Sequence, residues 1–294
     1  MMSSNPRIPY EMANQRRSLK GPNGKTLIVH LVVNVEHWEF ESSMPRQIIT
    51  APHGVEEVPD IPNFCWAEYG MRSGMPRILQ MFAERQLPAS TSINAGVVDA
   101  YPAIAEAMLK AGWEFIGHGF QQRSMQSEND EGGLIQAALN KLENFTGTPT
   151  RGWLSPGLKE TLDTPDILKA AGVDYVCDWV LDDLPTWMTT KHGPMIAMPY
   201  NLEVNDSVIY AVEKHSSPEM YTRMCDTVDC FDSEMADGTP RVLALGLHPH
   251  LIGVPHRIGY LKKILDLLMA RDDTVFLTGS QITDWFTDAD KGDA

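Results

Sequence analysis

The 294-residue sequence lacks the features that mark several common classes of protein. It contains no run of 18 apolar residues, and residues 1–24 lack the apolar core of a signal peptide. Its four cysteines form no CxxC pair, which disfavours a disulfide framework and a thiolate zinc site. These absences predict a soluble, cytoplasmic protein with reduced thiols.

Positive charge and phosphate-binding loops are also scarce. The 24 Lys and Arg residues are outnumbered by 39 Asp and Glu residues, which gives a formal net charge of -15. Because an acidic surface repels nucleic acid and anionic membranes, we expect neither of them as a partner. A glycine-rich phosphate loop is absent, which argues against a kinase or a dinucleotide-binding enzyme. The expected partner is a small neutral or cationic substrate.

Strand and helix patterns alternate regularly after residue 24. Hydrophobic residues make up 43% of the chain, enough for one large core. Strand patterns occupy residues 26–36, 89–94, 113–119, 150–155, 173–179, 194–200, 242–248 and 274–279. Helix patterns occupy residues 75–86, 101–112, 132–147, 164–172, 218–236, 258–270 and 282–286. Repeated strand–helix units predict a single α/β catalytic domain over residues 25–294, with a mainly parallel sheet.

Two segments lie outside this alternation. Residues 1–24 are polar and aperiodic, so we interpret them as an N-terminal arm that either wraps a neighbour or remains mobile. Residues 39–73 contain four prolines and the aromatic residues Phe64, Trp66 and Tyr69 without any periodicity. Long ordered loops of this kind cover active sites or make subunit contacts, and we expect one of these roles here.

Polar side chains gather at the ends of the predicted strands, where rigid backbone meets an open cleft. They are Glu36 with His37, His118, Arg151 with Trp153, Asp178 with Asp182 and Asp183, and His248. A carboxylate and a histidine that approach one cleft from different strands can act as general base and general acid, the minimum for hydrolysing an amide. Each group also has a structural alternative: a lone strand-end histidine is often only hydrogen-bonded, and the DDLP segment can be a helix cap and turn.

The order of these fragments is more informative than any single one. The fragments NVEH, GHGFQQ, RGWLSPG, CDWVLDDLP and LGLHPH resemble the successive motifs of the polysaccharide deacetylase (NodB-homology) superfamily, from about Lys25 to Phe286. The chain looks most like the branch of metal-independent allantoinases, cyclic imide hydrolases and a peptidoglycan deacetylase. The resemblance implies a distorted (β/α)7 barrel that hydrolyses non-peptide C–N bonds, often as a homotetramer.

The resemblance also implies roles for individual residues. Glu36 matches the catalytic base, and His248 matches the histidine that acts as general acid on the leaving nitrogen. Arg151 and Asp178 match groups that orient this pair. We therefore expect Glu36 to deprotonate a water molecule that attacks a carbonyl group, while His248 protonates the departing nitrogen.

The metal-ligand positions of the family are altered in this chain. His118 is retained, but His37 stands where the family has an acid and Gln122 stands where it has a second histidine. A catalytic zinc ion needs three good protein ligands, and a glutamine amide is a poor one. We expect no cofactor rather than one divalent, zinc-like metal held by His37, His118 and Gln122. Without metal, His118 and backbone amides near Gly119 would polarise the carbonyl group.

Aromatic residues near the motifs favour a small substrate. Trp38, Trp66 and Trp153, with Asp183, are the predicted substrate-binding residues, and a pocket of this kind suits a flat ring such as an imide or a hydantoin. Two other functions remain open. One is a metal-dependent deacetylase of N-acetylated carbohydrate, and the other is a catalytically inactive homologue that binds a small ligand.

Overall fold

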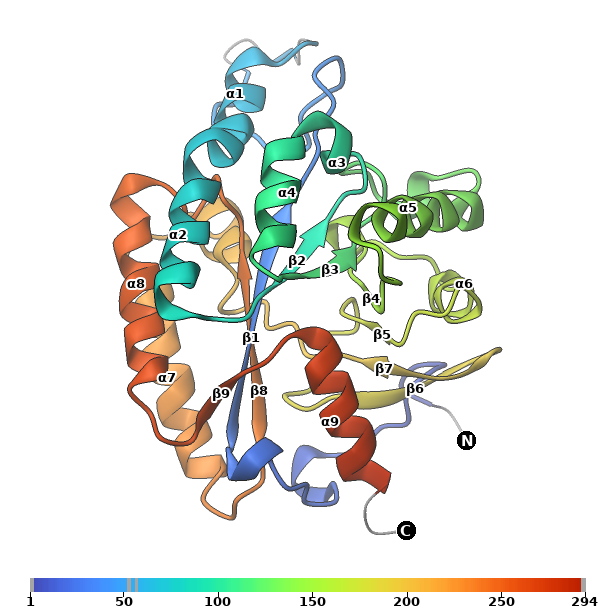
Figure 1. Ribbon diagram of the computed structural model, residues 1–294, viewed down its shortest axis with the longest axis vertical. Coiled ribbons are helices and arrows are strands. Elements are labelled where there is room, and N and C mark those ends of the chain that lie inside the picture. The colour runs from blue at the N-terminus through green and yellow to red at the C-terminus, as the bar shows by residue number, and fades with distance from the viewer. Residues whose placement is uncertain (1–2, 52–53, 56–57, 292–294) are drawn as a thin grey trace.

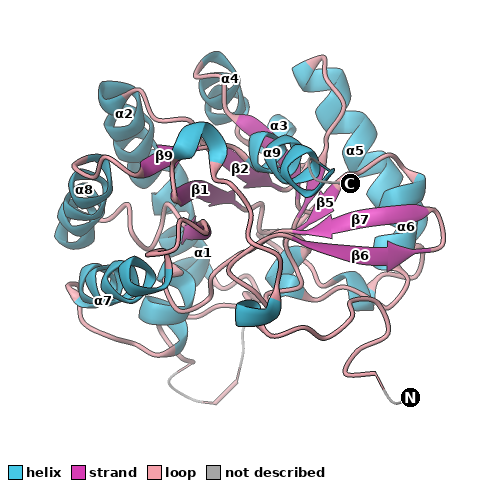
Figure 2. Cartoon of the chain, turned by 90° about the horizontal axis from the view of Figure 1, so that it is seen from below, coloured by secondary structure: helices cyan, strands magenta, loops and turns pink. Residues whose placement is uncertain are grey.

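The computed structural model describes residues 3–51, 54–55 and 58–291, and in this part of the chain nine strands form one curled sheet (Figures 1 and 2). The strand order is β6-β7-β5-β4-β3-β2-β1-β8, and β9 also pairs with β1. The strands are β1 Leu27–Val35, β2 Ser90–Ile93, β3 Glu114–Gly117, β4 Gly152–Trp153, β5 Tyr175–Val176, β6 Thr186–Thr190, β7 Gly193–Ala197, β8 Arg241–Leu247 and β9 Thr274–Phe276. Only β6 and β7 run antiparallel, so the predicted mainly parallel sheet is confirmed.

Helices surround the curled sheet (Figure 2). The α-helices are α1 Ile61–Tyr69, α2 Met75–Arg85, α3 Val97–Ala100, α4 Pro102–Lys110, α5 Glu131–Thr146, α6 Thr164–Ala170, α7 Glu219–Glu234, α8 Pro255–Met269 and α9 Gly279–Lys291. The predicted distorted barrel is therefore confirmed. It has more strands than the seven expected, because the β6–β7 hairpin extends one edge and β9 lies beside β1. In the described ranges, no helix has both the length and the apolar character needed to cross a bilayer.

Strand β1 divides the core into two layers. All nine of its residues are buried, because a strand in the middle of a parallel sheet is covered on both faces. Val29 and Val33 join the apolar cluster under the outer helices, whereas Ile28 and Val32 join a second cluster inside the curled sheet. Successive side chains of a strand point to opposite faces, so Glu36 continues the interior face of β1.

The segment at residues 39–73 was wrongly predicted to be loop throughout. Its second half forms α1 and a π-helical turn at Gly70–Gly74 that leads into α2. The side chain of Asp60 caps α1 by accepting a hydrogen bond from the backbone N–H of Asn63, and Pro62 lies in the first turn. An Asp followed by an early proline is a helix-start signal that outweighs the missing periodicity.

Glycines let this helical segment approach the loop after β8. A Cβ atom added at Gly74 would lie 2.0 Å from the carbonyl oxygen of Pro249, and one added at Gly70 would lie 2.4 Å from the backbone nitrogen of His250. Contacts this short involve backbone on both sides, so neither side can give way easily. The close packing fixes the helical segment against the loop that carries His248 and His250.

We expect Gly74→Ala to lower the free energy of unfolding by about 1–3 kcal/mol, because the added methyl group overpacks a backbone contact. Urea unfolding would measure this loss. The matched control is Gly132→Ala in α5, where an added Cβ meets nothing within 4 Å. That variant should be neutral or slightly more stable, since alanine is the better helix former. Equal stability of both variants would contradict the packing argument.

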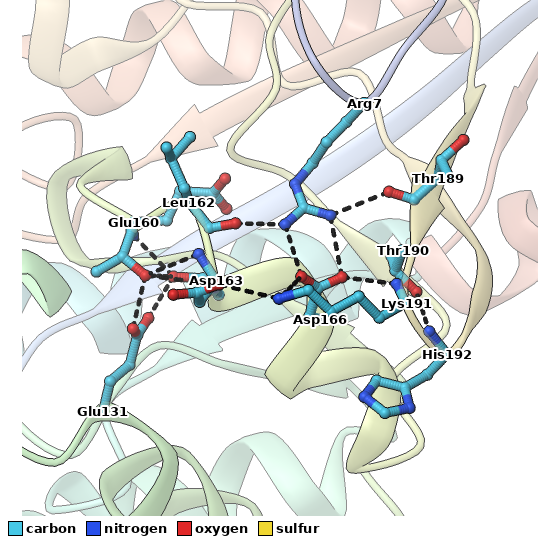
Figure 3. A network of polar contacts seen from close by, with 12 residues as sticks. Arg7, Glu131, Glu160, Leu162, Asp163, Asp166, Thr189, Thr190, Lys191 and His192 are labelled. Carbon is cyan, nitrogen blue, oxygen red and sulfur yellow. Dashed lines mark hydrogen bonds and ion pairs between the residues drawn. The ribbon is translucent and has the colours of Figure 1, made fainter.

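The N-terminal arm lies along its own chain. The Arg7 guanidinium forms a 3.0 Å ion pair with Asp166 and donates a hydrogen bond to the carbonyl oxygen of Thr189 (Figure 3). The backbone N–H of Thr189 in turn donates to the carbonyl oxygen of Arg7 at 2.9 Å. Further along the arm, Arg16 pairs with Asp182 at 2.7 Å. The described part of the arm therefore covers the β6 edge, which was not foreseen.

Candidate active site

Three candidate residues meet at one end of the sheet. The strand register pairs Val33 with Leu247, so Glu36 after β1 and His248 after β8 emerge at the same edge. His118 follows β3 at that edge, two strands away from β1. Carboxyl ends of parallel strands meet in this way in open α/β sheets and barrels, where they form the usual ligand site.

Glu36, His248 and Asp206 form a linear arrangement. The His248 Nε2 atom lies 3.6 Å from Glu36 Oε1, and its Nδ1 atom lies 2.6 Å from Asp206 Oδ1. The other Asp206 oxygen accepts hydrogen bonds from the backbone N–H groups of His248 and Ile252, at 2.7 and 3.2 Å. All three side chains are buried, so these contacts are shielded from water. The imidazole is thus held between two carboxylates.

The electrostatics give Glu36 and His248 opposite protonation states. Burial alone would raise the pKa of Glu36, but the hydrogen bond and the positive charge of His248 outweigh it and lower this pKa well below its usual range. Burial would lower the pKa of His248, but the charge and hydrogen bond of Asp206, with help from Glu36, raise it to about 9. At neutral pH the site therefore holds a carboxylate beside an imidazolium, as a base and an acid.

The Glu36 carboxylate has two further donors. Trp38 Nε1 donates to Oε2 at 3.0 Å, and Gln122 Nε2 donates to Oε1 at 2.9 Å. A cavity of about 10 Å³, lined by Glu36, Trp38, Tyr101 and His250 among others, lies beside it. This is about the room that one water molecule needs. A larger pocket of about 450 Å³ shares Trp38 as a lining residue with this cavity and is otherwise lined by His37 and Gln122 among others.

His250, two residues after His248, is packed among aromatic rings. Its ring centroid lies 4.8 Å from that of Trp66 and 6.3 Å from that of Trp38, both nearly edge to face. Burial lowers the pKa of His250 to about 3, so its imidazole is neutral at working pH. The predicted substrate-binding residues Trp38 and Trp66 thus both lie at this site.

His118 presents a lone pair to the site. Its Nδ1 atom is hydrogen-bonded to the carbonyl oxygen of Leu154, so Nδ1 must carry the proton. Within the described residues Nε2 has no partner, and neither does the neighbouring amide oxygen of Gln122. Burial lowers the pKa of His118. A neutral ring in this tautomer has no proton on Nε2, so His118 could polarise the carbonyl group only as an imidazolium, and this role stays a prediction.

The predicted metal ligands do not converge. The ring of His37 lies against Gly96 and edge-on to Tyr101, and Gln122 uses its amide nitrogen to bind Glu36. Over the described ranges, no group of three His, Cys, Asp or Glu side chains is placed to bind an ion. Among the described residues, His118 Nε2 and the Gln122 amide oxygen are unpartnered acceptors, but the adjacent Glu36 carboxylate already accepts from Trp38 and Gln122. The residues present therefore do not fit a catalytic divalent metal.

Three predicted site residues lie elsewhere. Trp153 is fully buried and its indole N–H donates to Ser155 Oγ, so it belongs to the core and not to a substrate pocket. Arg151 precedes β4 and binds Asp174 and Asp284, each at 2.7 Å, so it does not orient Glu36 or His248. Asp183 lies at the opposite end of the sheet, since its carbonyl oxygen accepts a hydrogen bond from the backbone N–H of Val242, the second residue of β8. The DDLP segment forms a bend there.

Asp178 forms a carboxyl pair with Glu160 and contacts neither Glu36 nor His248. It follows β5 and accepts a hydrogen bond from the backbone N–H of Ser155 at 2.8 Å. Its Oδ2 atom and the Oε2 atom of Glu160 are both buried without a donor in the described part of the chain, so protonation of one carboxyl group would let it donate to the other. Burial raises the pKa of both groups, and the charge of Asp178 adds to the increase at Glu160.

This pair predicts a pH-dependent stability. A carboxyl group with a raised pKa in the folded state stabilises the fold below its ordinary pKa, and this contribution is lost as pH rises through the raised value. The free energy of unfolding should therefore fall from about pH 5 to about pH 9. In Glu160→Gln the amide can donate to Asp178 at every pH, so this variant should be about 1 kcal/mol more stable than wild type at alkaline pH. Urea unfolding at both pH values measures this, and an unchanged pH dependence would contradict it.

Sequence reasoning missed Asp206, the partner of His248. It lies in PYNLEVND, just before the π-helical turn Val208–Val212, and no strand end marks it. The available signal was the PYNLEVND stretch as a whole, which resembles a stretch of the same family branch, but that resemblance did not single out Asp206. His250 is part of the HPH fragment, but nothing in the sequence distinguished a histidine of the site from an ordinary loop residue.

Residues 66–176 match the family model described as polysaccharide deacetylase. A Schizosaccharomyces pombe protein provisionally named a polysaccharide deacetylase is 26% identical over 89% of this chain and 90% of its own length. A Pseudomonas aeruginosa PAO1 structure described as a probable polysaccharide deacetylase is 25% identical, with a TM-score of 0.80, over 93% of this chain and 95% of the other. The Puue allantoinase structure is 24% identical, with a TM-score of 0.83, over 96% and 94%.

Proposed function

Since the chain is a hydrolase of the polysaccharide deacetylase (NodB-homology) superfamily, which acts on non-peptide C–N bonds, we propose that its substrate is a small cyclic amide, imide or ureide whose ring it opens. The observation that carries the reaction type is the Glu36–His248–Asp206 arrangement. It places a carboxylate and an imidazolium 3.6 Å apart, which are the protonation states that a base and an acid need at neutral pH.

In the proposed mechanism, Glu36 accepts a proton from a water molecule in the 10 Å³ cavity as that water attacks the ring carbonyl carbon. Trp38 and Gln122 hold the carboxylate in position with their N–H groups. His248 then donates its Nε2 proton to the ring nitrogen as the C–N bond breaks. The proton on Glu36 can return to His248 across 3.6 Å, which resets the pair.

Two observations support a small ring over a long glycan. The cavity beside Glu36 is closed in by Trp38, Phe64 and the turn that carries His250, which leaves little space for a polymer. The adjoining pocket of about 450 Å³ has the size of an ordinary small-molecule site. The similarity to Puue allantoinase, whose name specifies action on allantoin, extends over 96% of this chain and favours a ureide or imide.

A deacetylase of N-acetylated carbohydrate is the second candidate, because the S. pombe and P. aeruginosa relatives carry deacetylase names. Family deacetylases of that kind use a divalent metal, and the mismatch of His37 and Gln122 to a metal site weighs against it here. We propose that ring opening proceeds without metal. A homotetramer and a cytoplasmic location also remain proposals, supported only by the family resemblance and the sequence composition.

The deciding experiment is hydrolysis of succinimide, dihydrouracil, allantoin and an N-acetylglucosamine oligomer, each before and after chelation. We expect one of the rings to be opened at the same rate with and without chelator. Turnover of the oligomer that is lost on chelation and restored by zinc would instead establish the deacetylase. Binding of a ring without turnover of any substrate would identify an inactive homologue.

A further inference from the structure

A buried hydroxyl group lies where the segments that carry the site residues meet. The Tyr200 side chain is fully buried in the apolar cluster inside the curled sheet. Its hydroxyl oxygen accepts hydrogen bonds from the side-chain N–H groups of Asn34, at 2.9 Å, and Asn205, at 3.2 Å. Its own proton goes to Asn34 Oδ1 at 3.2 Å. Both asparagines are buried as well, so the hydroxyl group holds two amide groups that bulk water does not reach.

Asn34 connects this hydroxyl group to the base and to the acid of the site. It lies two positions before Glu36 on the interior face of β1, and it lines the water-sized cavity. Its amide N–H also donates to the carbonyl oxygen of Leu247 at 3.3 Å, and Leu247 is the residue before His248. The ends of β1 and β8 that carry Glu36 and His248 are therefore joined through one amide group.

Asn205 connects the hydroxyl group to Asp206. Its amide oxygen accepts a hydrogen bond from the backbone N–H of Ser207 at 2.8 Å, so the asparagine spans the residue between them. Gly246 of β8 packs directly against this contact. A Cβ atom added there would lie 2.2 Å from Asn205 Nδ2 and 2.7 Å from the Tyr200 hydroxyl oxygen. The segment that delivers Asp206 is thus held at a fixed distance from β8.

We propose that Tyr200 is a positioning residue whose hydroxyl group keeps the two carboxylates of the site in place around His248, an inference that rests on the proposed function. Asp206 lies 2.6 Å from the imidazole in a buried site, where the energy of a contact between charges depends steeply on distance. A carboxylate that moved away would leave the imidazole less able to hold the proton that it gives to the leaving nitrogen. The hydroxyl group acts on the reaction through its two asparagine partners.

The pKa of His248 reports these positions without interference from the charge of Tyr200. Burial raises the pKa of Tyr200, so its hydroxyl group is uncharged while His248 titrates. Besides Asp206, the titratable groups that face His248 are Glu36, 3.6 Å from Nε2, the His250 ring, 5.9 Å away between centroids, and buried His118. Replacing Tyr200 by phenylalanine leaves all of these groups in the protein. A changed pKa of His248 would therefore mean that its neighbours have moved.

Tyr200→Phe tests this role, with the titration of the His248 ring followed by NMR. In wild type the two carboxylates hold the pKa of His248 at about 9. We expect His248 of the variant to titrate at lower pH, because its carboxylate partners are less firmly held. We also expect kcat for ring opening to fall about 10- to 10²-fold with KM little changed, since small misplacements of catalytic groups cost factors of this size. An unchanged titration of His248 would overturn the proposal.

Tyr175→Phe is the matched control. Tyr175 is a fully buried tyrosine of the same interior cluster, and its hydroxyl group donates to Glu114 Oε1 at 2.9 Å, at the first residue of β3. Both variants lose a buried hydroxyl bond, so urea unfolding should show a similar loss of stability in each. Only Tyr200→Phe should alter the His248 titration and kcat. Equal changes of the titration in both variants would reflect a general loss of packing and would reject the positioning role.

The NMR titration needs no substrate, so it separates this inference from the proposed function. If wild type opens no ring, but His248 titrates at lower pH in Tyr200→Phe and not in Tyr175→Phe, the function is wrong and the positioning role stands. If wild type opens a ring and Tyr200→Phe titrates as wild type does, the function stands and the positioning role is wrong.

Discussion

Glu36→Gln should lower kcat for ring opening by about 10²- to 10⁴-fold while leaving substrate binding nearly unchanged. A glutamine amide has almost the shape of the carboxylate: Trp38 can still donate to its oxygen, and Gln122 can turn its own amide so that its unpartnered oxygen accepts from the new nitrogen. It cannot accept the proton of the attacking water, however, and loss of a general base typically costs a factor of this size. Steady-state kinetics on the ring identified by the substrate panel would measure kcat, and calorimetric titration would measure affinity.

Glu84→Gln is the control for this prediction. Glu84 is exposed on α2, where it accepts a hydrogen bond from Gln80 at 2.7 Å, so its replacement should leave kcat unchanged. A Glu36→Gln enzyme that keeps the wild-type rate would remove Glu36 from the mechanism. A variant that loses rate and affinity together would indicate that Glu36 binds substrate rather than water.

The central part of the site was predictable because it follows the most regular part of the sequence. The apolar run before Glu36 can only be a buried strand, and the run before His248 is another. Parallel neighbours end at the same edge, so the two residues had to emerge close together. Their separation and protonation states were not predictable, since these depend on Asp206, which arrives from a distant and irregular segment.

Arg151, Trp153 and Asp183 were misplaced for a different reason. Strand β4 has only two residues, so the sequence does not reveal which neighbours precede it, face inward or extend past its carboxyl end. A shift of one residue reverses the face of every side chain. Arg151 comes before the strand and Trp153 points into the core. Asp183 follows β5, but the chain has already returned to the amino end of β8.

Loops gave the least information. Residues 44–49 lie in an aperiodic stretch that gives no sign of where it packs. Their position depends on the burial of Met44 and on hydrogen bonds to the side-chain amide of Asn63, which belongs to a helix that the lack of periodicity concealed. Tertiary contacts between irregular segments leave no repeating pattern in the sequence, so they become visible only in the fold.

Asp206→Asn should lower kcat by about 10²- to 10⁴-fold at neutral pH and shift the alkaline limb of the pH–rate profile to lower pH. The Asp206 carboxylate, with help from Glu36, raises the pKa of His248 to about 9, so removing its charge lowers this pKa and leaves less of the imidazole protonated at neutral pH. A neutral imidazole is a far weaker acid toward the leaving nitrogen. The matched control is Asp229→Asn on the exposed face of α7, which should keep the wild-type profile.

The same substitution should also change stability, and the two effects can be separated. An asparagine amide has only one oxygen, so it cannot replace both hydrogen-bond acceptors of Asp206. If that oxygen faces His248 Nδ1, the backbone N–H groups of His248 and Ile252 lose their acceptor. In the reverse orientation the amide N–H group faces the N–H at Nδ1. Breaking a buried charge pair typically costs about 3–5 kcal/mol.

In wild type, protonation of His248 stabilises the fold fully below its ordinary pKa of 6.5, and this contribution is lost as pH rises through about 9. Urea unfolding of Asp206→Asn should show lower stability at pH 6 and a smaller loss between pH 6 and 9. A variant that is folded, equally stable and unshifted in its pH–rate profile would mean that Asp206 neither charges nor orients His248.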